Sequence, residues 1–384
     1  MAHRSSVEPS SECQQFRPLL ISQAHEQSDD QVIYRKLRTV RDVESSSVPS
    51  FGAEVESSTA AGVLLQGWCE GNHDAVAEVR RALAVYGVIG FRRSPEGRLL
   101  GPDDLVRLAG FLGCIQSTPQ SSLWGVAAGD GPRAPPFPSA QTPPPIRTRS
   151  EPPGSSPSTA VLRVVREAGQ TGEVFGEHWH RDGGFLEPPP QVGIFLGAEV
   201  PPLGGDTLFA CQQAACAALD LRLRSTLRAA RARHSQVNRR LIPQGDARAE
   251  AGPFPSNLRN VLGRHPQSGK EVIDVCEGFT EELLLSDQNS SLNGDNQNKD
   301  IGTEEEVAGT VPNEVLNELL RHCEQNEFTC RWVWRPGDLV IFDNHRTIHK
   351  ATAGYQGFRR EILRVLVGNL HPLQQPVLPR SGVS

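Results

Sequence analysis

The chain has 384 residues, enough for one large domain or two of ordinary size, and its 39 basic and 45 acidic residues give a formal net charge of −6. Glycine and proline together make about 17% of the chain against about 12% on average, whereas only 37% of the residues are hydrophobic. This composition favours a single loop-rich domain that carries unstructured insertions. The sequence has no basic block, which argues against nucleic acid as a partner, and no apolar run of about 20 residues, which excludes an integral membrane protein.

Residues 1–50 are rich in Ser, Gln and Glu, show no sustained periodicity and are predicted to form a disordered tail. Glu8 and Glu12 make the start too acidic for a typical transit peptide, and the segment lacks the apolar centre of a signal peptide. The eight cysteines are scattered without a Cys-x-x-Cys pair, so they are expected to be small core residues in a reducing compartment. These features predict a cytoplasmic protein.

The first regular elements are expected shortly after residue 51. Apolar residues recur at helical spacing from His73 to Val85, and the run 88–91 that follows is typical of a short buried strand. A second helix is predicted to begin at Pro102, because proline suits the first turn, and to end at Gly113.

Two later segments have the composition of surface insertions. Residues 129–158 hold the densest Pro, Ser and Gly, and residues 286–312 are rich in Asn, Asp and Gln. Such segments cannot bury enough apolar surface to offset their ordering entropy. The predicted organisation is therefore a tail over 1–50, one domain over 51–372 interrupted by both insertions, and a C-terminal tail over 373–384.

The rest of the chain is typical of short strands separated by long excursions. Strands are predicted at residues 192–196, 207–209, 328–334, 339–342 and 361–367. One long helix is expected over about residues 212–231. This order of elements predicts a mainly β fold, a double-sheet jelly roll with helices packed outside.

One short motif carries metal chemistry. Side chains alternate along an extended segment, so His180 and Asp182 point to the same side and can bind one metal ion. A third ligand can come from His345 or His349, which follow an apolar strand. Two histidines and a carboxylate suit non-haem Fe(II) and oxygen chemistry. His178 shares the face of His180 and could compete for the metal or be a polar residue at the pocket mouth. A bare His-x-Asp also occurs often by chance, and the histidine is then commonly a core residue with satisfied hydrogen bonds.

Several runs together resemble the taurine dioxygenase (TauD/TfdA) family of Fe(II)/2-oxoglutarate-dependent dioxygenases. They are HRDG at 180–183, PPLGGDTLFA at 201–210, WRPGD at 334–338 and RREILR at 359–364. The resemblance covers most of residues 50–371 apart from the insertions. It implies the double-stranded β-helix of the clavaminate synthase-like proteins.

The resemblance also assigns the metal and co-substrate ligands. It makes His180, Asp182 and His349 the iron ligands, since only His349 has the family's spacing to Arg360. It places Thr207 and Arg360 on the distal carboxylate of 2-oxoglutarate. No catalytic residue is implied beyond the metal centre.

Substrate contacts are implied for Arg364, Thr118 and Gly183. Arg360 and Arg364 lie four apart, hence on one face of a strand, and a planar guanidinium can hold a carboxylate through two hydrogen bonds. The other interpretation of this arginine pair is a solvated basic edge. Thr118 stands where taurine dioxygenase has a substrate-binding histidine, and the asparagine that commonly precedes the His-x-Asp motif is missing, so taurine is doubtful as the substrate.

The implied activity is hydroxylation of a small organic anion, a carboxylate or sulfonate, with Fe(II), with 2-oxoglutarate as co-substrate and with O2, forming succinate and CO2. Neither nucleic acid nor membrane is expected as a partner, and homo-oligomer formation is left open. The alternative is a catalytically impaired jelly-roll protein that binds iron and 2-oxoglutarate as a sensing or binding module. Fold alone does not separate the two.

Overall fold

The computed structural model describes residues 34–36, 51–55, 58–93, 99–116, 160–171, 174–242, 254–286 and 307–371. The predicted insertion at 129–158, the tail at 373–384 and Thr118 lie outside these residues, as does the tail at 1–50 except for one short strand. Among the described helices, none has both the length and the apolar character needed to cross a bilayer.

The N-terminal elements follow the sequence pattern closely. The order along the chain is α1 (Ser58–Glu70), α2 (His73–Tyr86), β3 (Val88–Phe91) and α3 (Pro102–Leu112). From residue 73 onward this is the order that the sequence predicted. The Asn72 side chain accepts hydrogen bonds from Asp74 N and Ala75 N in the first turn of α2, at 3.0 and 3.1 Å. Gly87, with φ of 73°, then ends α2 and turns the chain into β3.

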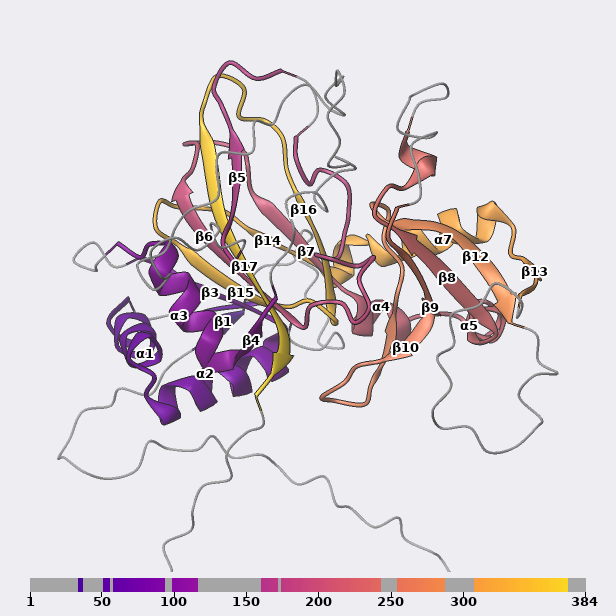
Figure 1. Ribbon diagram of the computed structural model, residues 1–384, viewed down its shortest axis with the longest axis horizontal. Coiled ribbons are helices and arrows are strands. Elements are labelled where there is room, and N and C mark those ends of the chain that lie inside the picture. Colours follow the sequence, from indigo (N-terminus) through magenta and orange to yellow (C-terminus); the bar gives the residue numbers. More distant parts are fainter. Residues whose placement is uncertain are drawn as a thin grey trace, which may run out of the picture. The chain divides into compact units, whose positions relative to one another are not determined.

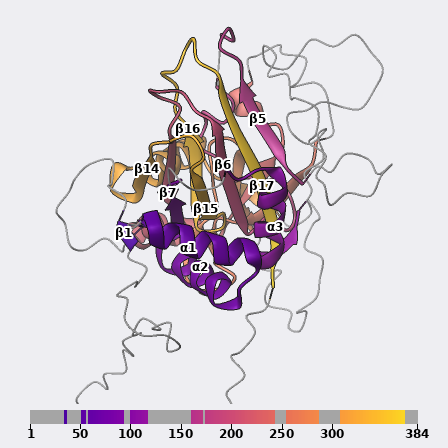
Figure 2. The ribbon, with the colours of Figure 1, turned by 90° about the vertical axis from the view of Figure 1, so that its left-hand side faces the viewer.

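A large sheet forms the scaffold of the molecule. Its strands run in the order β1-β2-β3-β15-β6-β17-β4, with β5 also paired to β17. The remaining members are β1 (Tyr34–Lys36), β2 (Ala53–Val55), β4 (Gly113–Ile115), β5 (Leu162–Arg166), β6 (Val192–Glu199), β15 (Leu339–Asp343) and β17 (Arg360–Leu370). Helices α1–α3 pack on this sheet (Figures 1 and 2), where Trp68, Leu105 and Ile194 belong to one buried apolar cluster. Strand β1 lies inside the segment expected to be a tail.

A smaller sheet of three strands, β14 (Thr329–Trp332), β7 (Thr207–Cys211) and β16 (Thr347–Ala351), shares a second core with the large one. That core is aromatic and includes Phe195 and Phe342 of the large sheet with Phe209 and Trp332 of the small one. The packing is tight, since a Cβ added to Gly90 of β3 would lie 2.0 Å from the Trp332 ring. Two sheets therefore enclose one layer of side chains, and strand β16 brings its residues to this layer.

A third group of elements lies to one side of these sheets in Figure 1 and shares a buried apolar cluster with Ala210 of β7 and Ile348 of β16. The accessory sheet, in the order β13-β12-β8-β9, consists of β13 (Val307–Thr310), β12 (Thr280–Ser286), β8 (Ala230–Ser235) and β9 (Ser256–Asn260). The group also contains a separate hairpin, one helix and two 3-10 turns. These are β10 (Leu262–Arg264) with β11 (Glu271–Ile273), α7 (Asn313–Cys323), Arg239–Leu241 and Asn326–Phe328. Strand β13 falls within the segment 286–312 that was expected to be an insertion.

The prediction of one long helix over 212–231 is wrong. The structure has two short helices, α4 (Gln212–Ala217) and α5 (Leu221–Arg228), and the chain is already extended in β8 from Ala230. Asp220 causes the break, because its carboxylate accepts a hydrogen bond from Leu223 N at 2.8 Å and begins a new helix. The fold as a whole is thus a mixture of helices and several sheets, less dominated by strands than expected.

Candidate metal centre

His180 and His349 are held opposite each other by the backbone. His180 N donates to His349 O at 2.9 Å and His349 N donates to His180 O at 2.8 Å, so the two residues form an isolated antiparallel bridge at the start of the 180–186 loop. Residues opposite each other in such a bridge present their side chains on the same face. The two imidazole rings accordingly lie with centroids 4.3 Å apart.

Asp182 completes the cluster two residues further on. Its Oδ1 lies 4.0 Å from His180 Nε2, and its Oδ2 lies 3.7 Å from His349 Nε2. Bonds of about 2.1 Å to one ion bridge donor pairs up to about 4.2 Å apart, so both separations suit a shared metal. No other cluster of three or more His, Cys, Asp or Glu side chains in the described residues converges in this way.

The hydrogen bonding at the cluster also fits a cation. Asp182 is 1% exposed, yet its Oδ2 has no hydrogen-bond partner in the described part of the chain, an arrangement that is costly unless an ion satisfies it. His180 Nδ1 donates to His178 O at 2.8 Å, which leaves Nε2 as the lone-pair nitrogen. Burial lowers the pKa of His180 and lowers that of His349 well below its usual value, so both are neutral, the form that binds metal.

Asn344 holds the backbone of Asp182, the carboxylate residue of this cluster. Its Oδ1 accepts from Asp182 N at 3.1 Å, and its Nδ2 donates to Asp182 O at 2.9 Å and to Pro190 O at 2.8 Å. The side chain is fully buried. Sequence reasoning assigned Asn344 no role of its own; the signal available was its place directly after an apolar strand and before His349.

Arg364, on β17, contacts the cluster directly. Its guanidinium forms an ion pair with Asp182 Oδ1, and the residue is 6% exposed. A buried cation therefore lies beside the predicted metal ligands. Gly183, the third residue predicted to contact substrate, forms the turn after Asp182 with φ of 60°.

Arg360 is the first residue of β17 and lies beside the turn that leads into β7. Its Nε donates to Gly205 O at 2.9 Å, and a Cβ on Gly205 would lie 3.1 Å from Arg360 Cδ. Thr207 is the first residue of β7, and its hydroxyl accepts from Trp334 Nε1 at 2.9 Å. Arg360 is 5% exposed and forms no ion pair with a carboxylate among the described residues. The structure thus brings Arg360 close to Gly205 and the start of β7, and none of the described carboxylates forms an ion pair with the buried guanidinium.

The two rival histidines lie outside the cluster. His178 Nδ1 is 3.1 Å from Glu277 Oε1, so this ring is engaged by a carboxylate. The His345 ring faces His265 edge-on at 6.2 Å, and burial lowers the pKa of His345 to about 4. Neither supplies a donor to the group formed by His180, Asp182 and His349.

The fold is similar to solved structures of dioxygenases. A taurine dioxygenase from Burkholderia xenovorans matches with a TM-score of 0.55 and 20% identity over 88% of this chain and 91% of that one. AAD-2, solved in complex with Mn(II) and N-oxalylglycine, matches with a TM-score of 0.57 and 17% identity over 90% of this chain and 99% of that one. At these identities the likeness concerns the fold alone.

Sequence comparison points the same way. The alpha-ketoglutarate-dependent 2,4-dichlorophenoxyacetate dioxygenase of Cupriavidus pinatubonensis is 29% identical over 205 residues, 53% of this chain and 63% of that protein. Pentalenolactone F synthase of Streptomyces arenae is 25% identical over 202 residues, 49% of this chain and 60% of that protein. The chain thus spans about three fifths of the length of these curated relatives. Residues 44–366 match the model of one family, and the chain belongs to that family, the taurine catabolism dioxygenase TauD/TfdA family.

Proposed function

We propose that this protein is an Fe(II)/2-oxoglutarate-dependent dioxygenase with a double-stranded β-helix core that hydroxylates a small organic anion. The observation that carries the proposal is the convergence of His180, Asp182 and His349 beside two buried arginines. Three protein donors leave positions open for a co-substrate and oxygen. The relative named above as alpha-ketoglutarate-dependent supports the choice of 2-oxoglutarate (alpha-ketoglutarate).

The metal would be held by His180 Nε2, His349 Nε2 and the Asp182 carboxylate. Fe(II) bound there supplies the oxygen-activating chemistry of the reaction. The protein contributes position and polarity. Asn344 holds the backbone of Asp182 on both sides, and the neutral imidazoles need lose no proton before they bind the ion.

Arg360 and Thr207 would bind the distal carboxylate of 2-oxoglutarate. The buried Arg360 guanidinium uses Nε on Gly205 O, which leaves its two terminal nitrogens to donate to an anion. The Thr207 oxygen already accepts from Trp334, so its own hydrogen can be donated to the same carboxylate. A dicarboxylic co-substrate would supply a counter-ion for Arg360, which forms no ion pair with a carboxylate of the described residues.

Arg364 would select an anionic substrate, with Gly183 and Thr118 as further contacts. Once Asp182 is engaged by a metal, the guanidinium that now pairs with it would be available to a carboxylate or sulfonate beside the iron. Thr118 cannot replace a cationic imidazole, so taurine itself is disfavoured. A carboxylate or a bulkier sulfonate is the expected substrate.

Anaerobic titration with Fe(II) and 2-oxoglutarate, followed by a panel of carboxylates and sulfonates in air, tests the proposal. We expect both ligands to bind and succinate to form in amounts that depend on one of the acids. Binding of both without turnover of any compound would favour the sensing or binding alternative. Failure to bind Fe(II) would contradict both.

Two arginine variants test the assigned roles. Arg360→Ala should raise the KM for 2-oxoglutarate about tenfold or more with little change for substrate, and Arg364→Ala should do the reverse. Arg359→Ala is the matched control, because Arg359 is paired with Glu167, Glu199 and Glu361 and should leave both constants unchanged. A rise in the 2-oxoglutarate KM from Arg364→Ala alone would reverse the assignment.

A further inference from the structure

The connection from β11 to β12, together with Thr280, the first residue of β12, forms the 274–280 loop, which packs against the predicted metal ligands. Gly278 N donates to Trp179 O at 2.9 Å, and Trp179 N donates to Glu277 Oε2 at 3.2 Å. A Cβ on Gly278 would lie 3.1 Å from His180 Cβ, and the Phe279 ring meets the His180 ring edge-on at 6.2 Å. His180 is therefore held between strand β16 and this loop of the accessory sheet.

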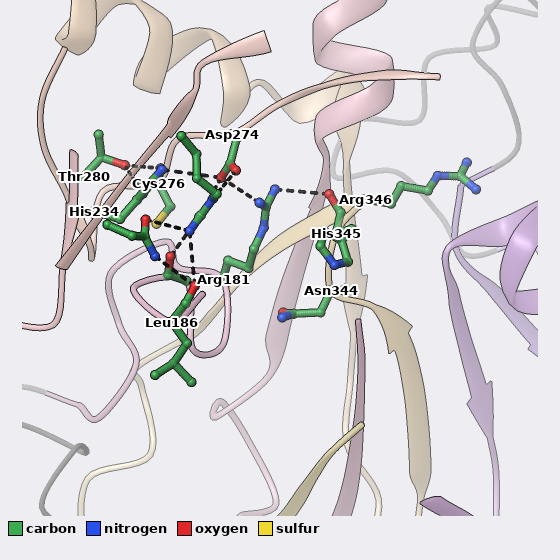
Figure 3. Close-up of polar contacts among 12 residues, drawn as sticks. Arg181, Leu186, His234, Asp274, Cys276, Thr280, Asn344, His345 and Arg346 are labelled. Atoms are coloured by element: carbon green, nitrogen blue, oxygen red, sulfur yellow. Dashed lines mark hydrogen bonds and ion pairs between the residues drawn. The ribbon is translucent and has the colours of Figure 1, made fainter. Parts of the chain in front are cut away.

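An ion pair joins the same loop to the centre of the His-x-Asp motif. Arg181, the residue between the two predicted ligands, donates to Asp274 Oδ1 at 2.6 Å and to His345 O at 3.1 Å (Figure 3). The side chains of Arg181 and Asp274 are 3% and 13% exposed. In a site so little exposed, an unpaired Arg181 would carry a large desolvation cost, so Asp274 strongly favours this one placement of the motif.

Asp274 also binds a second arginine that supports the rest of the 180–186 loop. Arg259 Nε donates to Asp274 Oδ2 at 2.7 Å, and its terminal nitrogens donate to Gly184 O at 2.8 Å and Leu186 O at 3.3 Å. The Asp274 carboxylate thus pairs with two arginines. Arg181 precedes Asp182 in the 180–186 loop, and Arg259 binds backbone oxygens of the loop after Asp182. Although burial by itself raises the pKa of Asp274, Arg181 and Arg259 keep it well below its usual value, so the carboxylate stays charged.

Contacts within the 274–280 loop and from strand β8 hold this loop in place. Thr280 Oγ1 accepts from Cys276 N at 2.9 Å and lies 3.2 Å from His234 Nδ1, while Asn238 Nδ2 donates to Glu277 O at 2.6 Å. The bond between Cys276 and Thr280 lies within the loop, and the other two contacts come from strand β8 and the turn that follows it. The 274–280 loop is therefore braced by strand β8 and the turn after it. The 180–186 loop has two turn hydrogen bonds of its own, Gly184 N to Arg181 O and Leu186 N to Gly183 O, and Arg181 and Arg259 connect it to Asp274.

We propose that the 274–280 loop, anchored by Asp274 on Arg181, positions His180 and Asp182 for metal binding. The inference rests on the proposed metal centre and adds a role for the accessory sheet. A metal site requires its donors to be held within about 0.5 Å of the binding geometry, and supporting residues outside the ligand set commonly change metal affinity about 10- to 100-fold. Asp274 and Gly278 are positioning residues that act through Arg181 and His180.

The first test is the affinity of the apoprotein for Mn(II), measured anaerobically at low temperature by the electron paramagnetic resonance of the free ion. Asp274→Asn should raise the Kd about tenfold. Glu271→Gln is the matched control: it removes a carboxylate from β11 that pairs with Arg224, away from the ligands, and should leave the Kd unchanged. Melting temperatures of both variants, taken in parallel, record any loss of stability.

A second variant keeps the test open if Asp274→Asn does not fold. Gly278→Ala adds only a methyl group, which would press on His180 and should raise the Kd for Mn(II) severalfold. Gly263→Ala adds the same group where the nearest atom lies 3.9 Å away, and should have no effect. His180→Ala identifies the metal centre itself and should abolish binding.

The outcomes separate the two ideas. If His180→Ala binds Mn(II) as tightly as the parent, the metal centre is wrong. If His180→Ala loses the metal while folded Asp274→Asn and Gly278→Ala bind like the parent, the metal centre stands and the positioning role is overturned. A lower melting temperature with an unchanged Kd would likewise show that Asp274 is only structural.

Discussion

Two clusters of histidine and carboxylate lie near the turn between β15 and β16, and they differ in how their polar atoms are satisfied. In the metal centre, Asp182 Oδ2 and His349 Nδ1 are buried without a hydrogen-bond partner among the described residues. In the second cluster, His265 Nε2 donates to Asp343 Oδ2 at 2.8 Å and His265 Nδ1 accepts from Ser268 N at 3.1 Å.

Both oxygens of the carboxylate in the second cluster, that of Asp343, accept hydrogen bonds. Asp343 Oδ1 accepts from His345 N at 3.1 Å and from Arg346 N at 3.0 Å, so it closes the turn that leads to His349. Residue type is therefore a poor guide to metal binding in this protein. Convergence of donors that do not satisfy one another marks the site, whereas the saturated cluster shapes the backbone beside it.

The largest expected effect is a loss of Fe(II) binding, which we expect from a substitution in the first cluster and not in the second. His180→Ala removes one of three donors and should weaken Fe(II) binding by at least about 100-fold and stop succinate formation. Isothermal titration under anaerobic conditions measures the first effect and a succinate assay the second. Retained affinity would mean that the ion binds elsewhere.

His265→Ala should have the opposite profile. Loss of the bond to Asp343 leaves a buried carboxylate with one fewer donor, so the free energy of unfolding should fall by about 1–3 kcal/mol. Urea denaturation measures this change. The Fe(II) affinity of the folded protein should stay within about threefold of the parent, and a loss as large as that of His180→Ala would erase the distinction between the clusters.

The pH dependence of stability offers a smaller test. Burial, with Arg181 nearby, lowers the pKa of His345 to about 4 against 6.5 for the free side chain. Between these values the unfolded chain binds a proton that the folded chain does not, so stability falls as the pH falls from 6.5 toward 4. In the apoprotein, His345→Gln should reduce this pH-dependent loss of the free energy of unfolding by on the order of 2 kcal/mol. Urea denaturation at several pH values measures the change. An unchanged pH profile would show that His345 titrates normally.

The smallest effect is expected for His178. Its ring is paired with Glu277, so His178→Ala should leave the Fe(II) affinity within about twofold. The same titration as for His180→Ala measures it. A loss comparable to that of His180→Ala would make His178 a ligand and would redraw the metal centre.

The amino-acid sequence by itself determined the local elements and the motif. Helices α2 and α3 and strand β3 begin and end where apolar spacing, Pro102 and glycine indicated. The His-x-Asp alternation indicated His180 and Asp182 as candidate ligands, and the resemblance to the TauD/TfdA family added His349 through the family's spacing to Arg360. These signals act between residues a few positions apart, which is the range that pattern reading covers.

Only the tertiary structure decided which polar groups satisfy one another. Asp274 and Arg181 are separated by 93 positions, and Asn344 meets Asp182 across 162. No periodicity records such contacts, because they depend on how the accessory sheet and the strand β16 approach the 180–186 loop. The same long-range packing saturates His265 and leaves His349 with a buried nitrogen that has no partner in the described residues. The fold therefore distinguishes a histidine with satisfied hydrogen bonds from one that is a candidate metal ligand.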